Sequence, residues 1–167
     1  MPSIIITVDI EMKPYLVKFL LSKSENGNLP IKFPRKSHYN LMLTNLVSNY
    51  NSLNSIPIED RQNVIDYFRP SRQGTEGVAI ILPFNDRKNI LSYNYLSVAS
   101  KKKFRGEVRL DFNYEFSRFM FKKLREGVPR NIICEKWKKM HDITEDDLKT
   151  ESLYRYSSRL LEEINSC

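Results

Sequence analysis

The chain has 167 residues and a mass of 19.8 kDa, which fits one domain or one domain with a small appendage. A hydrophobic fraction of 41%, with nine Phe and nine Tyr, excludes an intrinsically disordered chain. The longest apolar runs, such as residues 78–82, are too short for a transmembrane helix. The first residues lack the basic and long apolar regions of a secretory signal, and Cys134 and Cys167 are too few for a disulfide framework. We therefore expect a cytoplasmic, reduced protein with no membrane partner.

Positive charge is concentrated in the middle of the chain, which has a net charge of +7 and a pI near 9.4. Residues 85–139 contain fifteen Lys and Arg against six Asp and Glu, whereas residues 140–167 contain three against seven. Such an excess is typical of a polyanion-binding surface, because each phosphate that is neutralised releases condensed counterions. The charge pattern fits DNA and RNA equally well, and it fits single-stranded and double-stranded nucleic acid equally well.

The first half of the chain alternates between strand and helix patterns. Strands are indicated by runs of β-branched residues, and helices by apolar residues at spacings of three and four. The first strand begins with a continuous apolar run, so we expect it to be central in its sheet. The expected elements are a strand over 3–10, a helix from Pro14 to a turn at 24–28, an extended edge segment over 29–34, helices over 37–50 and 57–68, and a strand over 78–84. Residues 90–99 fit a strand and a helix equally.

The second half of the chain is predicted to be helical. A long helix is expected to place one apolar face towards the core and to end at Gly127, with Pro129 opening the next helix. The apolar face of the long helix consists of Val108, Phe112, Phe116, Phe119, Met120 and Leu124, and that of the next helix of Ile132, Ile133, Trp137 and Met140. We predict an α+β fold, with an α+β domain over residues 1–105 and a helical extension over 106–167.

Basic residues in the second half form the main candidate site. Arg118, Lys122 and Arg125 fall at helical spacings away from the Phe face, and a denser basic cluster precedes them. The alternative is an ordinary solvated helix face on which Glu115 and Glu126 are partial partners. We expect Lys101, Lys102, Lys103, Arg105, Arg109, Arg118, Lys122 and Arg125 to gather into one surface that contacts phosphate, with Tyr93, Tyr95 and Phe104 stacking on bases.

Residues 128–163 approximate a helix-turn-helix, with a helix over 130–141 and a second helix after Thr144. The second helix would present Glu145, Asp146 and Asp147 to the DNA groove, where three carboxylates would be repelled by phosphate. These acids are better explained as partners of the positive end of the helix dipole, with Thr144 and Asp147 as a capping pair. A tail that packs or binds a partner is therefore favoured over base readout.

Asp9 and Glu11 form an Asp-x-Glu pair at the end of a strand, where alternation places both on one face. Paired carboxylates of this kind hold Mg²⁺ in metal-dependent nucleases, which also need a further carboxylate such as Asp66, Asp86 or Asp111. His38 and His141 lack metal-ligand spacing, and we expect both at the surface or at helix caps. We expect no cofactor and no bound metal.

Two stretches of the chain resemble small uncharacterised proteins of phages and integrative mobile elements. They are residues 8–16, from Val8 to Leu16, and residues 113–159, which include 127–131 and 143–148. The resemblance implies an accessory role in the DNA metabolism of such an element or in its control, and it assigns no role to any residue.

The predicted function is non-enzymatic binding of nucleic acid, with DNA as the expected partner and backbone contacts rather than base readout. One alternative is a protein-interaction module that docks through the helical tail, with Trp137, Tyr154 and Tyr156 as anchors. The other is a Mg²⁺-dependent nuclease that uses Asp9 and Glu11. The Phe face of the long helix fits burial within a monomer and burial across a homo-oligomer equally.

Overall fold

The computed structural model describes residues 7–47, 76–83 and 96–166, and it has an α+β fold. Five helices accompany a two-stranded sheet in these residues, and no helix among them is long and apolar enough to cross a membrane. The predicted helix over 57–68 lies outside the described residues. The elements are β1 (Thr7–Met12), α1 (Pro14–Leu21), α2 (His38–Leu46), β2 (Glu76–Ile81), α4 (Val98–Arg125), α5 (Arg130–Met140) and α6 (Thr150–Asn165).

The sheet pairs β1 with β2 in antiparallel register, from Thr7 opposite Ile81 to Met12 opposite Glu76. A third segment joins it on the far side of β2, where the Ile31 N–H donates to the Ala79 carbonyl at 2.9 Å. Ile31 thus lies at the edge of the sheet within the segment predicted to be extended over 29–34, and among the residues of that segment it alone forms a bridge. Among the described residues it is β2, rather than β1 as expected, that has partners on both sides, because β1 pairs with β2 alone.

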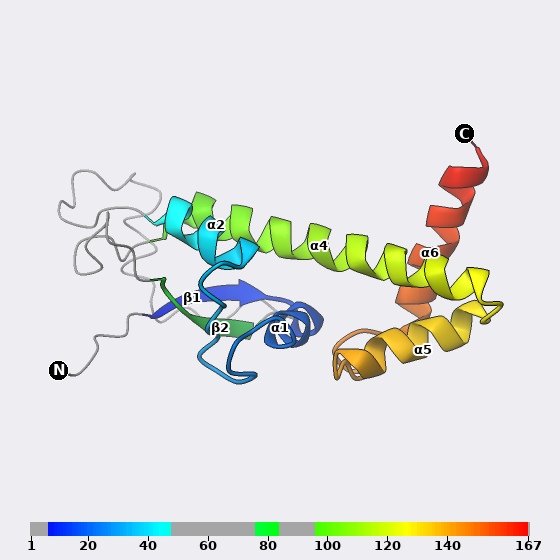
Figure 1. Cartoon of the computed structure of the whole chain (residues 1–167), viewed down its shortest axis with the longest axis horizontal. Helices are drawn as coiled ribbons and strands as arrows, with labels where there is room; N and C mark the ends of the chain where they lie inside the picture. The colour runs from blue at the N-terminus through cyan, green and yellow to red at the C-terminus, as the bar shows by residue number, and fades with distance from the viewer. Residues whose placement is uncertain (1–6, 48–75, 84–95, 167) are drawn as a thin grey trace.

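The 28-residue helix α4 is the longest described element, and the other elements pack along it (Figure 1). Its first turn is capped by the Ser97 hydroxyl, which accepts a hydrogen bond from the Ser100 N–H at 3.0 Å. The helix runs without interruption through residue 105, where a domain boundary was expected. Lys101, Lys102, Lys103 and Arg105 therefore lie on α4 itself and not on a segment before it.

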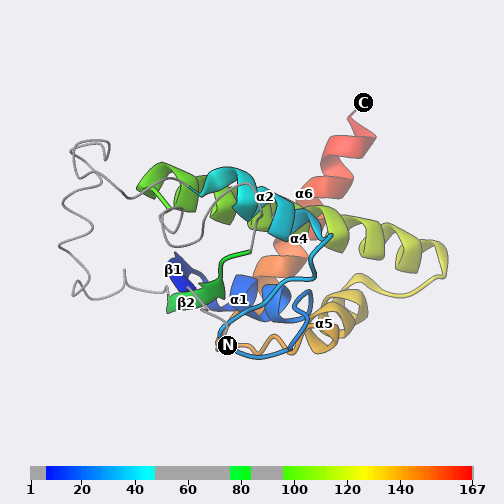
Figure 2. The same cartoon turned by 60° about the vertical axis from the view of Figure 1, so that its left-hand side comes forward.

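The buried face of α4 rotates along its length. Phe104, Val108, Phe112, Phe116 and Met120 lie four residues apart and are at most 3% exposed. Four residues correspond to about 400° of helix, so each step moves the buried position by about 40° around the axis. The first half of α4 consequently packs on β1, α1 and α2, and the second half on α5 and α6 (Figures 1 and 2).

An aromatic cluster at Phe112 joins the two halves of the molecule into one core. The Phe112 ring lies 5.0 Å from Tyr15, 5.4 Å from Phe19 and 5.9 Å from Trp137, measured between ring centroids. His141 was expected at the surface or at a helix cap; it is the C-cap residue of α5, but it is buried, 8% exposed, and lies 4.3 Å from the Trp137 ring. Its Nδ1 is 2.9 Å from the Ser22 hydroxyl at the end of α1, while its Nε2 is buried without a hydrogen-bond partner among the described residues.

The turn between α4 and α5 is set by Gly127, as the sequence predicts. Gly127 has a φ of 77°, in the left-handed region that favours glycine. Its N–H bonds to the Leu124 carbonyl at 3.0 Å and the Val128 N–H bonds to the Lys123 carbonyl at 3.1 Å, which is a Schellman motif. The motif reverses the chain so that α5 packs back against α4. Met140, predicted on the apolar face of α5, is instead 59% exposed, because the chain leaves the helix there.

The predicted helix after Thr144 does not form, so residues 128–163 are not a helix-turn-helix with a two-residue turn. Turns follow α5, and the next helix, α6, begins at Thr150. Thr144 and Asp147 do form the predicted reciprocal pair, since each backbone N–H bonds to the other side chain, at 2.8 and 3.3 Å. The pair closes a single turn and does not begin a helix. The neighbouring Glu145 carboxylate bonds to Lys138 and Thr150.

Lys138 is the buried charge of this region, with a side chain only 6% exposed. Its ammonium contacts the Glu145 carboxylate and donates to the Thr150 hydroxyl at 3.1 Å. Hydrogen bonds lower the pKa of Glu145 to about 2, and the bond from Lys138 has a larger effect than those from Thr150. The interaction fixes the connection between α5 and the start of α6.

Replacing Phe112 with Ala is expected to lower the free energy of unfolding by about 3–5 kcal/mol, because it opens a cavity where three elements meet. Leu110→Ala is the control, since Leu110 lies on the same helix but is 61% exposed, and its effect should stay within about 0.5 kcal/mol. Urea denaturation of both variants measures the difference. Equal stability of the two variants would contradict a shared core at Phe112.

Replacing Glu145 with Gln is expected to reduce stability at neutral pH and to flatten its acid dependence. The pKa of Glu145 lies below its ordinary value of 4.5, so its ionised form stabilises the fold above pH 4.5. That contribution is lost as the pH falls from 4.5 towards about 2. Urea denaturation at a series of pH values measures it, with Glu135→Gln on the exposed face of α5 as the control for the lost charge. If the stability of Glu145→Gln and that of the wild type changed in parallel with pH, the ionised Glu145 carboxylate would not be the group that stabilises the fold.

Candidate nucleic-acid interface

The eight predicted phosphate-contacting residues all lie on α4, but they do not form the single surface that the sequence predicts. Nine residues separate Arg109 from Arg118, which is two and a half turns at about 100° per residue. The two arginines therefore point to opposite sides of the helix. Lys102, Arg105 and Arg109 lie within about 60° of one another on one side, and Arg118, Lys122 and Arg125 lie within about 60° on the other.

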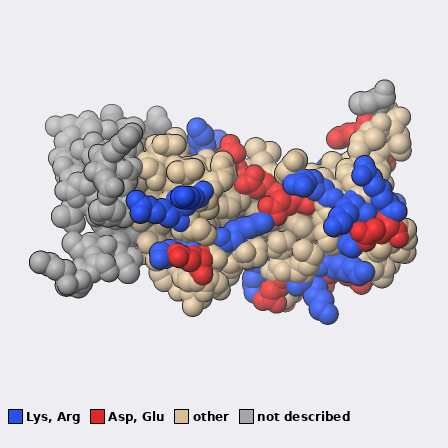
Figure 3. All heavy atoms as spheres, in the orientation of Figure 1, with Lys and Arg blue, Asp and Glu red and all other residues tan. Residues whose placement is uncertain are grey.

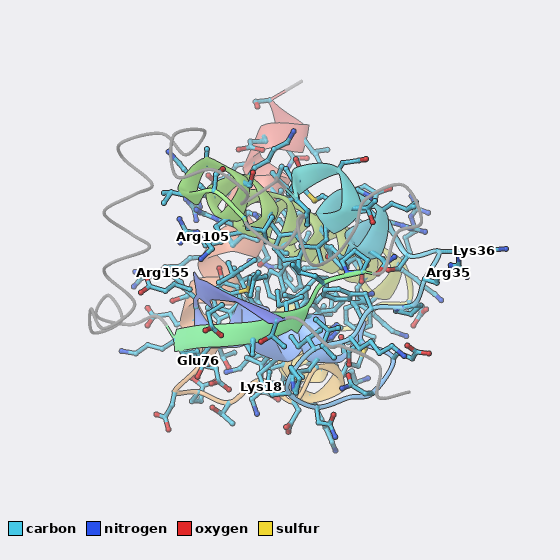
Figure 4. The ribbon with its side chains drawn as sticks, turned by 90° about the vertical axis from the view of Figure 1, so that its left-hand side faces the viewer. Lys18, Arg35, Lys36, Glu76, Arg105 and Arg155 are labelled. Carbon is cyan, nitrogen blue, oxygen red and sulfur yellow. The ribbon has the colours of Figure 1, made fainter. Side chains whose placement is uncertain are left out.

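Arg105 and Arg109 of the first group lie on the side of β1 and α1. The Arg105 guanidinium donates to the Glu11 carbonyl oxygen at 3.2 Å, and Arg109 is close enough to Tyr15 to act on its titration. Arg105 is half-buried, which leaves its guanidinium less available to a ligand. Figure 4 places Arg105 on the side of the molecule away from Arg35 and Lys36, which precede α2. Arg105 thus takes part in the contact between α4 and the sheet, whereas Lys102 and Arg109 are exposed.

The second group lines a groove that runs along α4 towards His38 at the start of α2. Arg118, Lys122 and Arg125 are all exposed there, beside the rings of Tyr114 and Phe119. Two acids share the groove, and both are engaged by other residues. They are Glu115, which forms an ion pair with Lys23 at 2.6 Å, and Asp111, which is hydrogen-bonded to Tyr39. Burial raises the pKa of Tyr39, and the Asp111 carboxylate raises it further, so the Tyr39 hydroxyl keeps its proton for this bond.

A second groove lies between α4 and α5, on the other side of Phe119. It is lined by Phe119 and Lys123 from α4 and by Lys136, Lys139 and Met140 from α5. These three lysines are not among the residues that the sequence predicts for the site. Lys136 and Lys139 are three residues apart on a helix, which is a detectable signal, but only the packing of α5 on α4 brings them to Lys123. The six cations that line the two grooves are Arg118, Lys122, Lys123, Arg125, Lys136 and Lys139, and we call this set the α4–α5 basic surface.

Glu126 reports the electrostatic field of this surface. A hydrogen bond from Lys123 lowers the pKa of its carboxyl, and the charges of Lys122 and Lys136 lower it further. The three lysines are thus close enough to act on one carboxylate although they come from two helices. In Figure 3, Lys and Arg side chains gather at the right-hand end of the molecule, over the C-terminal part of α4 and over α5, with acidic side chains among them.

Two of the predicted stacking residues, Tyr93 and Tyr95, lie outside the described residues, and the third is corrected by the structure. Phe104 is fully buried, with its ring 6.3 Å from Phe33 and 5.9 Å from Tyr39 between centroids. It belongs to the core between α4 and α2 and presents no face to a base. Phe104 adjoins the basic cluster in the sequence, but in the structure it begins the series of buried positions four residues apart on α4.

The residues of the two alternative functions are placed as follows. Asp9 and Glu11 share the outer face of β1, as predicted, while Val8, Ile10 and Met12 face the core. Asp66 and Asp86 lie outside the described residues, and within the described ranges no three His, Cys, Asp or Glu side chains are grouped to hold a metal ion.

Trp137 is 2% exposed, which removes it as an anchor for a partner. Tyr154 is half-buried, and its hydroxyl accepts a hydrogen bond from Arg130 at 2.9 Å.

Comparison with known proteins returned no match. No family model matches the chain, and no curated protein and no solved structure is significantly similar to it.

Replacing Lys123 with Met is expected to raise the pKa of Glu126 towards its ordinary value of 4.5, because it removes the hydrogen bond that lowers it most. Carboxyl chemical shifts followed by NMR through an acid titration measure this change. Lys136→Met should raise the same pKa by less, since Lys136 acts on Glu126 through its charge alone. No response to Lys136→Met would mean that α5 does not bring its lysines to α4.

Proposed function

We propose that this protein binds nucleic acid through the phosphate backbone, at the α4–α5 basic surface. The observation that supports the proposal is the convergence of six cations from two helices on two grooves that share the Phe119 ring, against two lining carboxylates, Asp111 and Glu115, of which Glu115 is paired with Lys23. A row of cations on a rigid scaffold matches a regular row of phosphates, and neutralising each phosphate releases counterions. DNA is the expected partner.

The arrangement favours backbone contacts over reading of base edges. Its cations lie along the sides of α4 and α5, whereas a recognition helix presents its N-terminal residues to a groove. The helix expected to play that part does not form after Thr144. Lysine contacts to phosphate position a protein on nucleic acid and carry no sequence information, so binding should depend on salt and little on sequence.

Reversing charge on the α4–α5 basic surface is the test. The double variant Lys122→Glu with Lys136→Glu takes one cation from each helix, and it should reduce the slope of log K against log salt by about two. Fluorescence anisotropy of a labelled DNA oligonucleotide at several salt concentrations measures both affinity and slope.

The matched control is Lys102→Glu with Lys103→Glu, which makes the same change in net charge at exposed residues in the first turns of α4. This control should retain most of the affinity, because both residues lie outside the two grooves. Equal loss in the two double variants would show that net charge alone drives binding. An absence of binding by the wild type at low salt would refute the proposed function.

A further inference from the structure

The exposed ring of Tyr114 on α4 has no part in the core. It is 63% exposed and lies four residues before Arg118. The Arg118 guanidinium carbon is 5.7 Å from the Tyr114 ring centroid, so the cation lies over one face of the ring. The ring lies within a groove that carries three exposed cations.

Tyr114 is in line with the cations of the groove. Tyr114, Arg118 and Lys122 are four residues apart, and Arg125 follows after three more, so all four lie within about 80° of the helix circumference. The line from Tyr114 to Arg125 is about 16 Å long at 1.5 Å per residue. A chain of phosphates that follows the cations would therefore carry its attached groups past the Tyr114 ring.

Phe119 gives the groove a second aromatic surface, which is held in place by the core. Its ring packs 5.4 Å from Trp137, between centroids, and it forms part of the wall of both grooves. Of the two acids in the groove, Glu115 is neutralised by its ion pair with Lys23, which leaves Asp111 as the one acid there that no cation among the described residues pairs with, against three cations.

We propose that the α4–α5 basic surface takes single-stranded rather than double-stranded nucleic acid, with a base stacked on Tyr114 and phosphates on Arg118, Lys122 and Arg125. The faces of the bases are covered in a duplex, whereas a single strand offers them to any exposed ring. Arg118 contributes by stacking as well as by charge, since a guanidinium also packs on aromatic faces. This inference rests on the proposed function, because without phosphate binding Tyr114 would have no strand to stack on.

The test compares one DNA sequence as a single strand and as a duplex, by anisotropy at one salt concentration. The wild type should bind the single strand more tightly. Tyr114→Ala should weaken single-strand binding about tenfold and leave duplex binding and the salt slope unchanged, because it removes a stacking surface and no charge. Tyr114→Phe should restore the affinity, since it keeps the ring.

Two controls isolate stacking. Leu110→Ala truncates another exposed side chain one turn earlier on α4 and should not affect binding. A single strand with abasic residues should bind the wild type as weakly as the intact strand binds Tyr114→Ala. Equal affinity for single strand and duplex, or no effect of Tyr114→Ala on the single strand, overturns this inference and leaves the proposed function intact. Failure to bind either nucleic acid overturns the proposed function itself.

Discussion

The rotation of the buried face of α4 is the constraint on which the rest of the structure depends. Core positions four residues apart, from Phe104 to Met120, advance by about 160° around the axis over four steps. A straight helix with this pattern cannot pack on one partner along its whole length. It must rest on the sheet, α1 and α2 with one side and on α5 and α6 with another, and the exposed side rotates with it.

This rotation explains why the basic residues of α4 serve different purposes. Arg105 and Arg109 fall near the edge of the buried face, where a long side chain reaches the backbone of β1 or approaches Tyr15. By Arg118 and Lys122 the buried face has moved to the other side of the axis, and the cations point directly into solvent. The same residue types therefore support packing in the first half and form an open groove in the second.

The elements of the fold were largely predictable from local signals, and the site was not. Pro14 at the start of α1 and Gly127 at the end of α4 each act within a few residues, and the structure confirms them. Of the strand predicted over 3–10, the structure describes residues 7–10, and these lie in β1. Helical spacing along α4 places Arg109 and Arg118 on opposite sides of the axis. Because α4 begins at Val98, Phe104 is part of the helix, and it lies on its buried face. The contribution of Lys136 and Lys139 depends on tertiary packing, which no local pattern encodes.

The acidic side chains of the described residues form ion pairs mostly with cations outside the α4–α5 basic surface, so this surface stays positive. Asp142 pairs with Lys18, Glu115 with Lys23 and Glu145 with Lys138, and each of these bridges joins separate elements or adjacent helices. The acid-rich residues 140–167 thus neutralise cations at the contacts of α5 with α1 and α6, away from the outer side of α4. Within the described residues, ion pairs engage Lys123 of the α4–α5 basic surface and leave its five other cations to solvent. An excess of positive charge that the fold does not consume in its own contacts remains available to a polyanion, and it lies beside the two rings, Tyr114 and Phe119, that the core leaves open.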